Sequence, residues 1–532
     1  MTITSLTFIV FAFATILAYY VVPKKYQWCV LLLANIVFYA YAGWKAACFV
    51  LFTATSIFFG ALGMERVLAK QKALFAAQKE TLTKEEKKAV KHKNQRRRRR
   101  IMLFVLLANI GILCVTKYTD FALAQVNSLL AALGGGEVRY ELNLIVPLGI
   151  SFYTFQSVGY LLDVYWEKIS PQSNYLKFLL FVSFFPQMTQ GPISEYGQLS
   201  RELFAEHPFS YKNYSYGMQR MLWGFAKKML VADVLSVYVA NVFANYERYT
   251  GITTLLGAFC YAVQIYADFS GYMDIMCGLC ETLGIRLKEN FDRPYFSRSI
   301  AEYWRRWHIS LGDWFKNYLY YPIGMSDWSR RLAKKTKRRF GAHIGNTLPA
   351  TLALLVVWTA TGLWHGASWA YIVWGLLNGV FIIVSMWMEP VYVKWKSKLG
   401  LHDESRAFRA FQILRTFTLV TFIKVLPEVG DLRRGLGLWK HIFTDHRLPT
   451  GVGQLLEFAD TGKLWLILAA GGSLMMLLVS VLKSKYQVRD LFNQLPFAVR
   501  IILLSCGAVL VAAFGGMAMY LFGGGGFLYA GF

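Results

Sequence analysis

The chain has 532 residues, of which 56% are hydrophobic and 17% are charged, and its formal net charge is +26. The charged fraction lies well below the roughly 25% of soluble domains, so the composition excludes a soluble globular protein. A strongly basic soluble protein would suggest nucleic acid as partner. In a membrane protein, however, short basic loops face the cytoplasm, so we expect the lipid bilayer and no nucleic acid.

Apolar runs long enough to cross a bilayer core of about 30 Å recur from one end of the chain to the other. They predict an all-α, polytopic protein with about 11 to 13 membrane passages in a single membrane domain, 1–532. The predicted spans are 5–22, 27–43, 46–63, 101–117, 143–163, 175–193, 218–244, 252–280, 347–369, 371–388, 411–427, 463–483 and 499–522. The run 175–193 contains Pro186 and Pro192, which is compatible with a re-entrant segment.

Residues 1–22 lack the basic start of a cleavable signal, so we expect them to form the first permanent span. Residues 65–100 carry fourteen Lys or Arg against four Glu and end in five arginines, Arg96 to Arg100. This pattern predicts a basic cytoplasmic helical insertion whose arginines meet anionic headgroups. The N-terminus is then extracytoplasmic. The other basic segments predicted to be cytoplasmic are 286–306, 328–339 and 394–415.

Two aspartates, Asp268 and Asp274, lie inside the predicted span 252–280. An ionised carboxylate there costs about 3 kcal/mol, so each needs a partner, and Arg293 and Arg305 are candidates. We interpret both as structural. Cys277 and Cys280 match CxxC, but no second pair or nearby histidine completes a metal site, so we expect two packed helix residues and no metal.

The stretch around His308 carries aromatic residues at helical spacing, which predicts an amphipathic helix that lies at the membrane interface or dips partway into the bilayer. The apolar positions are Tyr303, Trp304, Trp307, Leu311, Trp314 and Phe315. Arg305 and Arg306 could hold a phosphate or pyrophosphate, while a plain basic helix edge fits them equally well.

His365 lies inside the apolar stretch from Leu348 to Met386. Ionisable residues there are expensive and usually functional, and a neutral imidazole can accept and return a proton near pH 7. Gly362 and Gly366 flank His365, and such small residues let a backbone or a thin acyl chain approach closely. A satisfied packing histidine is the alternative.

Two parts near the C-terminus complete the chain. Region 389–462 carries no motif that can be assigned. The tail 527–532 reads Phe527-Leu-Tyr529-Ala-Gly-Phe532, which fits an interfacial anchor, although a tyrosine hydroxyl can also accept an acyl group once a base takes its proton.

These motifs together resemble the membrane-bound O-acyltransferase (MBOAT) family. The matching stretches cover most of 145–380, which we take as the catalytic core. They are Gln190–Ile193, Gln264–Asp274, Asn290–Tyr295, Trp304–Tyr320 and Gly362–Trp374. The sequences around His365 and around Tyr321-Pro322 are similar to those of the bacterial alginate and peptidoglycan O-acetyltransferase branch. The branch that attaches D-alanine to teichoic acids is the alternative.

The resemblance implies a ring of tilted helices around a thin centre, with a tunnel through the membrane. It implies that His365 and His308 are catalytic, with Trp304, Trp364 and Asp268 in support and Arg305 and Arg306 at the donor site. The tail resembles one found in these export systems, so Tyr529 is expected to relay the acyl group. The insertion 65–100 is longer than the family core leads one to expect.

The implied reaction takes an acyl group, expected to be acetyl, from a cytoplasmic thioester such as acetyl-CoA, with no tightly bound cofactor. The acceptor would be an extracytoplasmic polysaccharide at the cell membrane. Expected partners are an SGNH-type acyltransferase and an acyl carrier protein. A glycan transporter or flippase is the alternative of another class, although the paired, interrupted helices of many transporters are not found.

Overall fold

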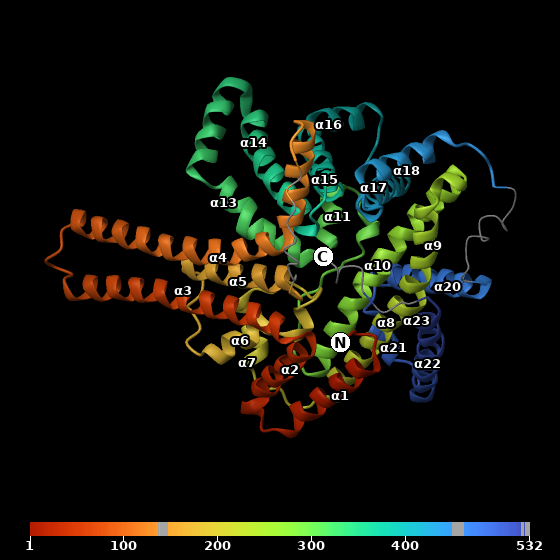
Figure 1. Cartoon of the computed structure of the whole chain (residues 1–532), viewed down its shortest axis with the longest axis horizontal. Coiled ribbons are helices and arrows are strands. Elements are labelled where there is room, and N and C mark those ends of the chain that lie inside the picture. The colour runs from red at the N-terminus through yellow and green to blue at the C-terminus, as the bar shows by residue number, and fades with distance from the viewer. Residues whose placement is uncertain (137, 139–146, 450–461, 523–525, 527–532) are drawn as a thin grey trace. The chain divides into compact units, whose positions relative to one another are not determined.

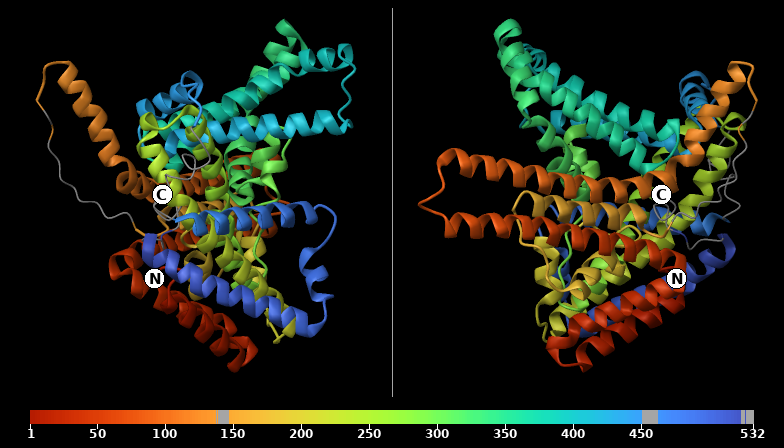
Figure 2. Two further views of the ribbon diagram at one scale, coloured as in Figure 1. Left: turned by 90° about the vertical axis from the view of Figure 1, so that its right-hand side faces the viewer. Right: turned by 60° about the vertical axis from the view of Figure 1, so that its left-hand side comes forward.

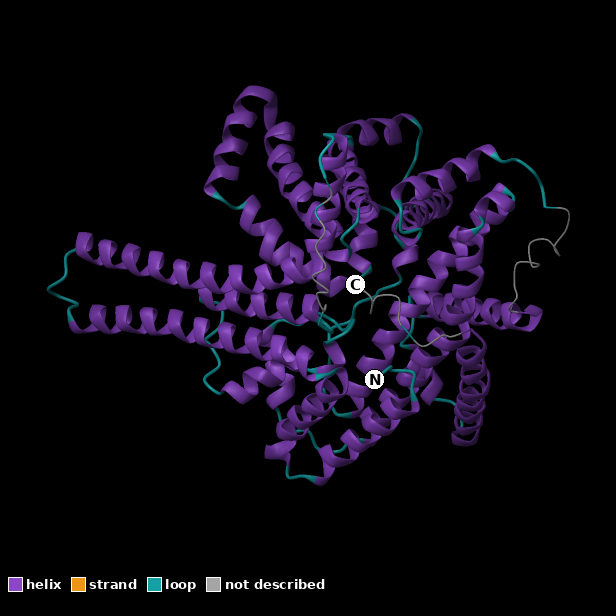
Figure 3. Cartoon of the chain, viewed as in Figure 1, coloured by secondary structure: helices purple, strands orange, loops and turns teal. Residues whose placement is uncertain are grey.

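The computed structural model describes residues 1–136, 138, 147–449, 462–522 and 526. Within these ranges the regular secondary structure consists of helices and one isolated β-bridge between Phe291 and Trp307. Figure 3 shows helices joined by loops and turns. The predicted all-α class is confirmed over the described residues.

The chain divides into two compact units. The first consists of Ile3–Tyr211 together with Leu283–Leu287, and the second consists of Lys212–Thr282 and Lys288–Phe532. Both histidine motifs belong to the second unit. The single domain inferred from the sequence stays a prediction.

Seven α-helices lie in the described residues of the first unit, in the order of the chain. They are α1 (Leu6–Val21), α2 (Gln27–Ala42), α3 (Trp44–Ala77), α4 (Lys84–Ala132), α5 (Ile150–Tyr165), α6 (Tyr175–Ser183) and α7 (Tyr196–Phe204). Helices α3 and α4 run side by side as a long hairpin (Figures 1 and 2).

The basic segment 65–100 forms the distal part of this hairpin and is largely helical, while its cytoplasmic location stays a prediction. A capping box starts α4, since the Thr83 side chain accepts from the Glu86 N–H while the Glu86 carboxylate accepts from the Thr83 N–H. One of the five arginines departs from the expected contact with lipid. Arg98 is buried and its guanidinium pairs with Glu167 and donates to the Tyr165 carbonyl at 2.8 Å. It therefore caps the end of α5.

The second unit carries the longer series of helices. They are α8 (Tyr211–Ala226), α9 (Asp233–Ala244), α10 (Gly251–Thr282), α11 (Ile300–Arg306), α12 (Ile309–Phe315), α13 (Tyr321–Gly324), α14 (Asp327–His365), α15 (Trp369–Trp387), α16 (Glu389–Lys398), α17 (Arg406–Glu428), α18 (Leu432–Thr444), α20 (Gly462–Leu482), α21 (Val488–Asn493), α22 (Phe497–Leu510) and α23 (Gly516–Phe522). Among the described residues of this unit, π-helical turns lie at η3 (Lys227–Ala232), η6 (Lys316–Tyr320) and η7 (Val511–Gly515).

Eight helices in the described part of the chain are long and apolar enough to cross a membrane. Two further apolar helices, Leu6–Val21 and Tyr175–Gln187, are shorter. The number is therefore lower than the 11 to 13 passages expected from hydropathy. The expected span 175–193 shows why, since α6 ends at Ser183 and a short 3₁₀ turn containing Pro186 follows.

Helix α14 reverses direction partway along. Gly341 has a left-handed φ of 88°, and it separates a basic first half from an apolar second half. A Cβ on Gly345 would lie 2.5 Å from the Lys337 side chain, so the two halves fold back on each other. The second half then runs to His365, where α14 ends.

Candidate active site

His308 lies at a break between two short helices, where the sequence predicted one continuous helix. Helix α11 ends at Arg306, and His308 caps α12 in a left-handed conformation with φ 49° and ψ 53°. This conformation is uncommon for a residue other than glycine. Trp307 and His308 are each only 1% exposed, so both side chains lie in the interior of the protein. The position of this stretch relative to the membrane interface stays a prediction.

The segment 290–292 holds this break in place. The Asp292 N–H donates to the Arg306 carbonyl at 3.0 Å, and the Ile309 N–H donates to the Asn290 carbonyl at 3.1 Å. The Asn290 side-chain oxygen accepts from the Ser310 N–H at 2.9 Å. Strained backbone persists only where its surroundings fix it, and these bonds bracket His308 on both sides.

The His308 ring packs edge-on against two aromatic rings. Its centroid lies 4.8 Å from that of Phe269 on α10 and 6.1 Å from that of Trp364 on α14. Burial lowers the pKa of His308 to about 3. The imidazole is therefore neutral at pH 7, because its apolar surroundings disfavour the charged form.

His365 is the last residue of α14 and is 3% exposed. Its ring centroid lies 4.8 Å from both Trp364 and Trp374, and it stacks on Tyr371 at 6.4 Å. A Cβ at Gly366 would come within 2.2 Å of the Tyr371 ring, so this glycine leaves the room that the stacking needs.

Trp364 joins the two histidines into one buried cluster, since each imidazole packs against its indole. Trp304 extends the cluster, with ring centroids 5.6 Å from Trp374 and an indole N–H that donates to the Asn378 side chain at 3.0 Å. We call this set the histidine centre. It consists of Phe269, Trp304, His308, Trp364, His365 and Trp374.

The glycines near His365 bring α14 and α15 together. A Cβ at Gly362 would lie 2.6 Å from the Tyr371 carbonyl, and one at Gly375 would lie 2.5 Å from the Trp358 carbonyl. Gly362 therefore admits a neighbouring backbone, one of the two alternatives considered for it.

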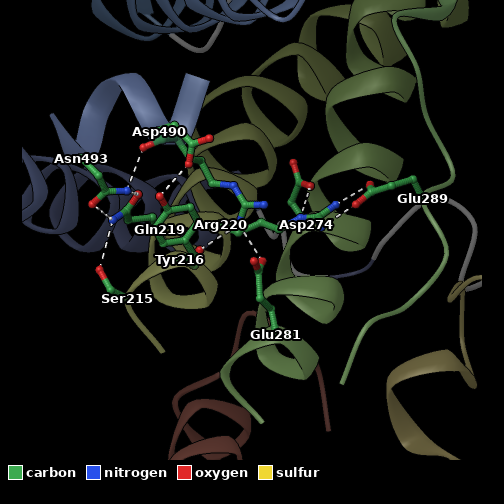
Figure 4. Close-up of polar contacts among 10 residues, drawn as sticks. Ser215, Tyr216, Gln219, Arg220, Asp274, Glu281, Glu289, Asp490 and Asn493 are labelled. Carbon is green, nitrogen blue, oxygen red and sulfur yellow. Dashed lines mark hydrogen bonds and ion pairs between the residues drawn. The ribbon is translucent and has the colours of Figure 1, made fainter. Parts of the chain in front are cut away.

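The partners of the two aspartates on α10, Asp268 and the partly buried Asp274, differ from those suggested by the sequence. Asp268 pairs with Lys228 at 2.7 Å, and Asp274 pairs with Lys227 at 2.7 Å and Arg220 at 2.8 Å. Arg220 also forms a bidentate pair with Glu289 (Figure 4). Because Glu289 adjoins Asn290, this network holds the segment that brackets His308.

The candidate cations Arg293 and Arg305 do not take that role. Arg293 pairs with its neighbour Asp292 at 3.2 Å. Arg305 is exposed, and Arg306 is partly buried and pairs with Glu302 one helical turn away at 2.7 Å. These arginines remain accessible candidates for an anionic donor, and Arg305 is the more available of the two.

Sequence reasoning missed three buried lysines. Lys227 and Lys228 fall in the predicted span 218–244, and Lys424 falls in the predicted span 411–427, so a charge inside an apolar run was the available signal. Lys424 is 4% exposed, and its ammonium lies 3.3 Å from the Trp307 ring centroid and within 5.4 Å of those of Tyr295 and Tyr303. This cation–π contact fixes the residue next to His308 and gives region 389–462 a part in the site.

Tyr529 lies outside the described residues. The nearest described position is Gly526, whose carbonyl accepts from the Lys228 ammonium at 2.7 Å. Cys277 and Cys280 are buried, free cysteines on α10, in line with the packing role expected for them.

Residues 167–398 match the model of MBOAT, the membrane-bound O-acyltransferase family, and this range contains both histidines. A probable alginate O-acetylase AlgI of Pseudomonas putida is 30% identical over 426 residues, which cover 80% of this chain and 76% of that protein. The chain belongs to the membrane-bound O-acyltransferase family. It is therefore a multi-pass membrane protein and an O-acyltransferase, and not the glycan transporter considered as the alternative.

Two further relatives match shorter parts of the chain. A peptidoglycan O-acetyltransferase of Helicobacter pylori is 31% identical over 313 residues, covering 53% of this chain and 54% of that protein. A teichoic acid D-alanyltransferase of Bacillus subtilis is 28% identical over 283 residues, covering 53% and 68%. The predicted kinship with the alginate and peptidoglycan O-acetyltransferases is confirmed.

Proposed function

We propose that this MBOAT enzyme moves an acetyl group from a cytoplasmic thioester, acetyl-CoA, to a polysaccharide outside the cytoplasmic membrane. The observation that carries the proposal is the histidine centre, in which two imidazoles 57 positions apart in the sequence pack against one indole. A buried site that excludes water protects a thioester from hydrolysis.

His365 acts as the general base in this scheme. It takes the proton of an acceptor hydroxyl while the oxygen attacks the thioester carbonyl, giving a tetrahedral oxyanion. Collapse of that intermediate breaks the carbon–sulfur bond, and the proton on His365 returns to the departing thiolate. The products are an ester and a free thiol, and His365 is regenerated.

His308 has a different part, because its lowered pKa makes it a poor base at pH 7. A neutral imidazole can still donate a hydrogen bond to a developing oxyanion. We assign this role to His308, with Trp304, Trp364 and the Asp268 ion pair keeping the centre in shape.

Arg305 and Arg306 lie three and two residues before His308 and are proposed to receive the phosphates of the donor. An acyl carrier protein could deliver the thioester in place of free coenzyme A. Tyr529 is the proposed first acceptor, and an SGNH-type partner would pass the acetyl group on to the polysaccharide.

D-alanyl transfer to teichoic acids is the second candidate, favoured by the similarity to the teichoic acid D-alanyltransferase of Bacillus subtilis. The same base and oxyanion chemistry serves both acyl groups. The D-alanyl group differs from the acetyl group in the amino group and the methyl group on its α-carbon.

The test is the base-releasable ester content of the cell envelope, measured by mass spectrometry in wild-type and His365→Ala strains. Loss of acetate supports the proposal, and loss of D-alanine moves the enzyme to the second candidate. Unchanged contents of both would contradict catalysis by His365.

A further inference from the structure

Lys227 and Lys228 are neighbours in the π-helical turn η3 but serve different partners. Lys227 bonds the Asp274 carboxylate at 2.7 Å and the Ser270 hydroxyl at 2.8 Å. Lys228 is 2% exposed, and its ammonium lies 2.7 Å from both Asp233 and Asp268. π-Helical turns of this kind occur frequently at functional sites.

Lys228 makes a third contact that Lys227 lacks. Its ammonium donates to the main-chain carbonyl of Gly526 at 2.7 Å, a contact across 298 positions of sequence. A hydrogen bond from a charged donor is about twice as strong as a neutral one. The start of the C-terminal segment is therefore bonded to a buried cation.

The C-terminal helices pack against the same turn. Trp465 and Ala469 of α20 and Ala518 of α23 share one buried apolar cluster with Val231 and Ala232 of η3. Close contacts bring the backbones together, since a Cβ at Gly472 would lie 2.5 Å from the Val231 side chain, and one at Gly515 would lie 2.9 Å from that of Met229. These helices lead the chain back to Lys228.

The ion pair between Lys228 and Asp268 lies next to a residue of the histidine centre. Asp268, bonded to Lys228, is followed on α10 by Phe269, whose ring packs against His308 at 4.8 Å. Two consecutive residues of α10 therefore link the two sites. Asp268 pairs with the lysine that bonds Gly526, and Phe269 packs against His308.

We propose that Lys228 is a positioning residue that docks the C-terminal segment, through the Gly526 carbonyl, beside the helix that carries Asp268 and Phe269. Tyr529 follows three residues later in the sequence. The proposal deepens the acyl relay assigned to Tyr529 and rests on it for its catalytic consequence. The attachment itself is independent of that relay.

The test follows the mobility of a nitroxide on Ala530→Cys by electron paramagnetic resonance, in the full chain with its native cysteines replaced. The docked tail of the parent protein should give a slow-motion spectrum. Lys228→Met should shorten the rotational correlation time at least about threefold. Lys227→Met is the matched control, because it removes the adjacent buried lysine without touching Gly526 and should keep the parent spectrum.

Lys228→Met leaves two carboxylates without their cation, so it could fail to fold. A triple variant that adds Asp233→Asn and Asp268→Asn removes those charges as well, and it should show the same freed tail. A parent-like spectrum in the triple variant, or an equal change in Lys227→Met, would overturn the docking role.

Acetyl transfer measured on the same samples separates this proposal from the relay. A freed tail with transfer reduced about tenfold or more supports both. A freed tail with full transfer supports the docking and contradicts the relay through Tyr529.

Discussion

The backbone of His308 is in the left-handed conformation, which costs on the order of 1 to 3 kcal/mol. Contacts with neighbouring residues have to offset this cost. These are the hydrogen bonds to residues 290–292 on one side and the Lys424 contact with Trp307 on the other. His365 needs no such strain, because it ends a regular helix. The two imidazoles therefore pack against the same indole from different backbone conformations.

Neutral burial of His308 predicts a pH dependence of stability. Its folded pKa of about 3 lies below the ordinary value of 6.5, so the unfolded state binds the proton first as pH falls. The stabilisation is complete above pH 6.5 and is lost between pH 6.5 and 3. Between pH 7 and pH 5 the wild-type protein should lose about 2 kcal/mol through this group.

The measurement is the shift of the thermal midpoint from pH 7 to pH 5 in wild-type protein and in His308→Gln. The variant, which has no group titrating here, should show the smaller shift. Equal shifts would mean that His308 is not buried in its neutral form.

At the scale of helices, the contact between α14 and α15 determines where His365 lies. Gly362 and Gly375 let these helices approach until main-chain atoms touch side by side. A methyl group at Gly375 would lie 2.5 Å from the Trp358 carbonyl, so the helices must separate to admit it. The aromatic rings around His365 would move with them.

Gly375→Ala should therefore lower the thermal midpoint, by overpacking that typically costs about 1 to 3 kcal/mol, and reduce acyl transfer. Gly471→Ala on α20 is the matched control, because nothing lies within 4 Å of the added methyl group. It should be neutral or slightly stabilising, since alanine favours the helix over glycine. An unchanged midpoint in Gly375→Ala would show that the close approach does not matter.

Sequence patterns predicted the helical class and drew attention to His365, because apolar runs and rare intramembrane residues are local features. His308 was a candidate through the family resemblance, and the catalytic roles of both histidines stay predictions. The patterns did not predict the break in the helix at His308, because it depends on hydrogen bonds between residues 290–292 and residues 306–310. They also did not identify Lys227 and Lys228 as the partners of the aspartates, although both lie in a predicted span. Pairing between distant helices is a tertiary property that helical periodicity alone does not encode.

At the scale of the whole molecule, charges buried among apolar helices have to be neutralised locally for the chain to sit in a bilayer. Asp274 illustrates this, since it lies between Lys227 and Arg220. Asp274→Asn leaves the Lys227 ammonium, whose side chain is buried, without its carboxylate, while Arg220 keeps Glu289, and it should lower the stability by about 1 to 3 kcal/mol. The exposed pair of Asp327 and Arg330 provides the control, because Asp327→Asn should leave the thermal midpoint unchanged. Equal midpoints in the two variants would show that the buried network carries no stability.

The central claim is that this MBOAT enzyme transfers acyl groups at the histidine centre. The direct measurement is transfer of labelled acetyl from acetyl-CoA by the purified protein in liposomes, comparing wild type with His365→Ala and with His402→Ala, an exposed histidine outside that centre. We predict that His365→Ala slows transfer by about 10²- to 10⁴-fold and that His402→Ala stays near wild type. Wild-type transfer by His365→Ala, in protein that keeps its thermal midpoint, would contradict the account.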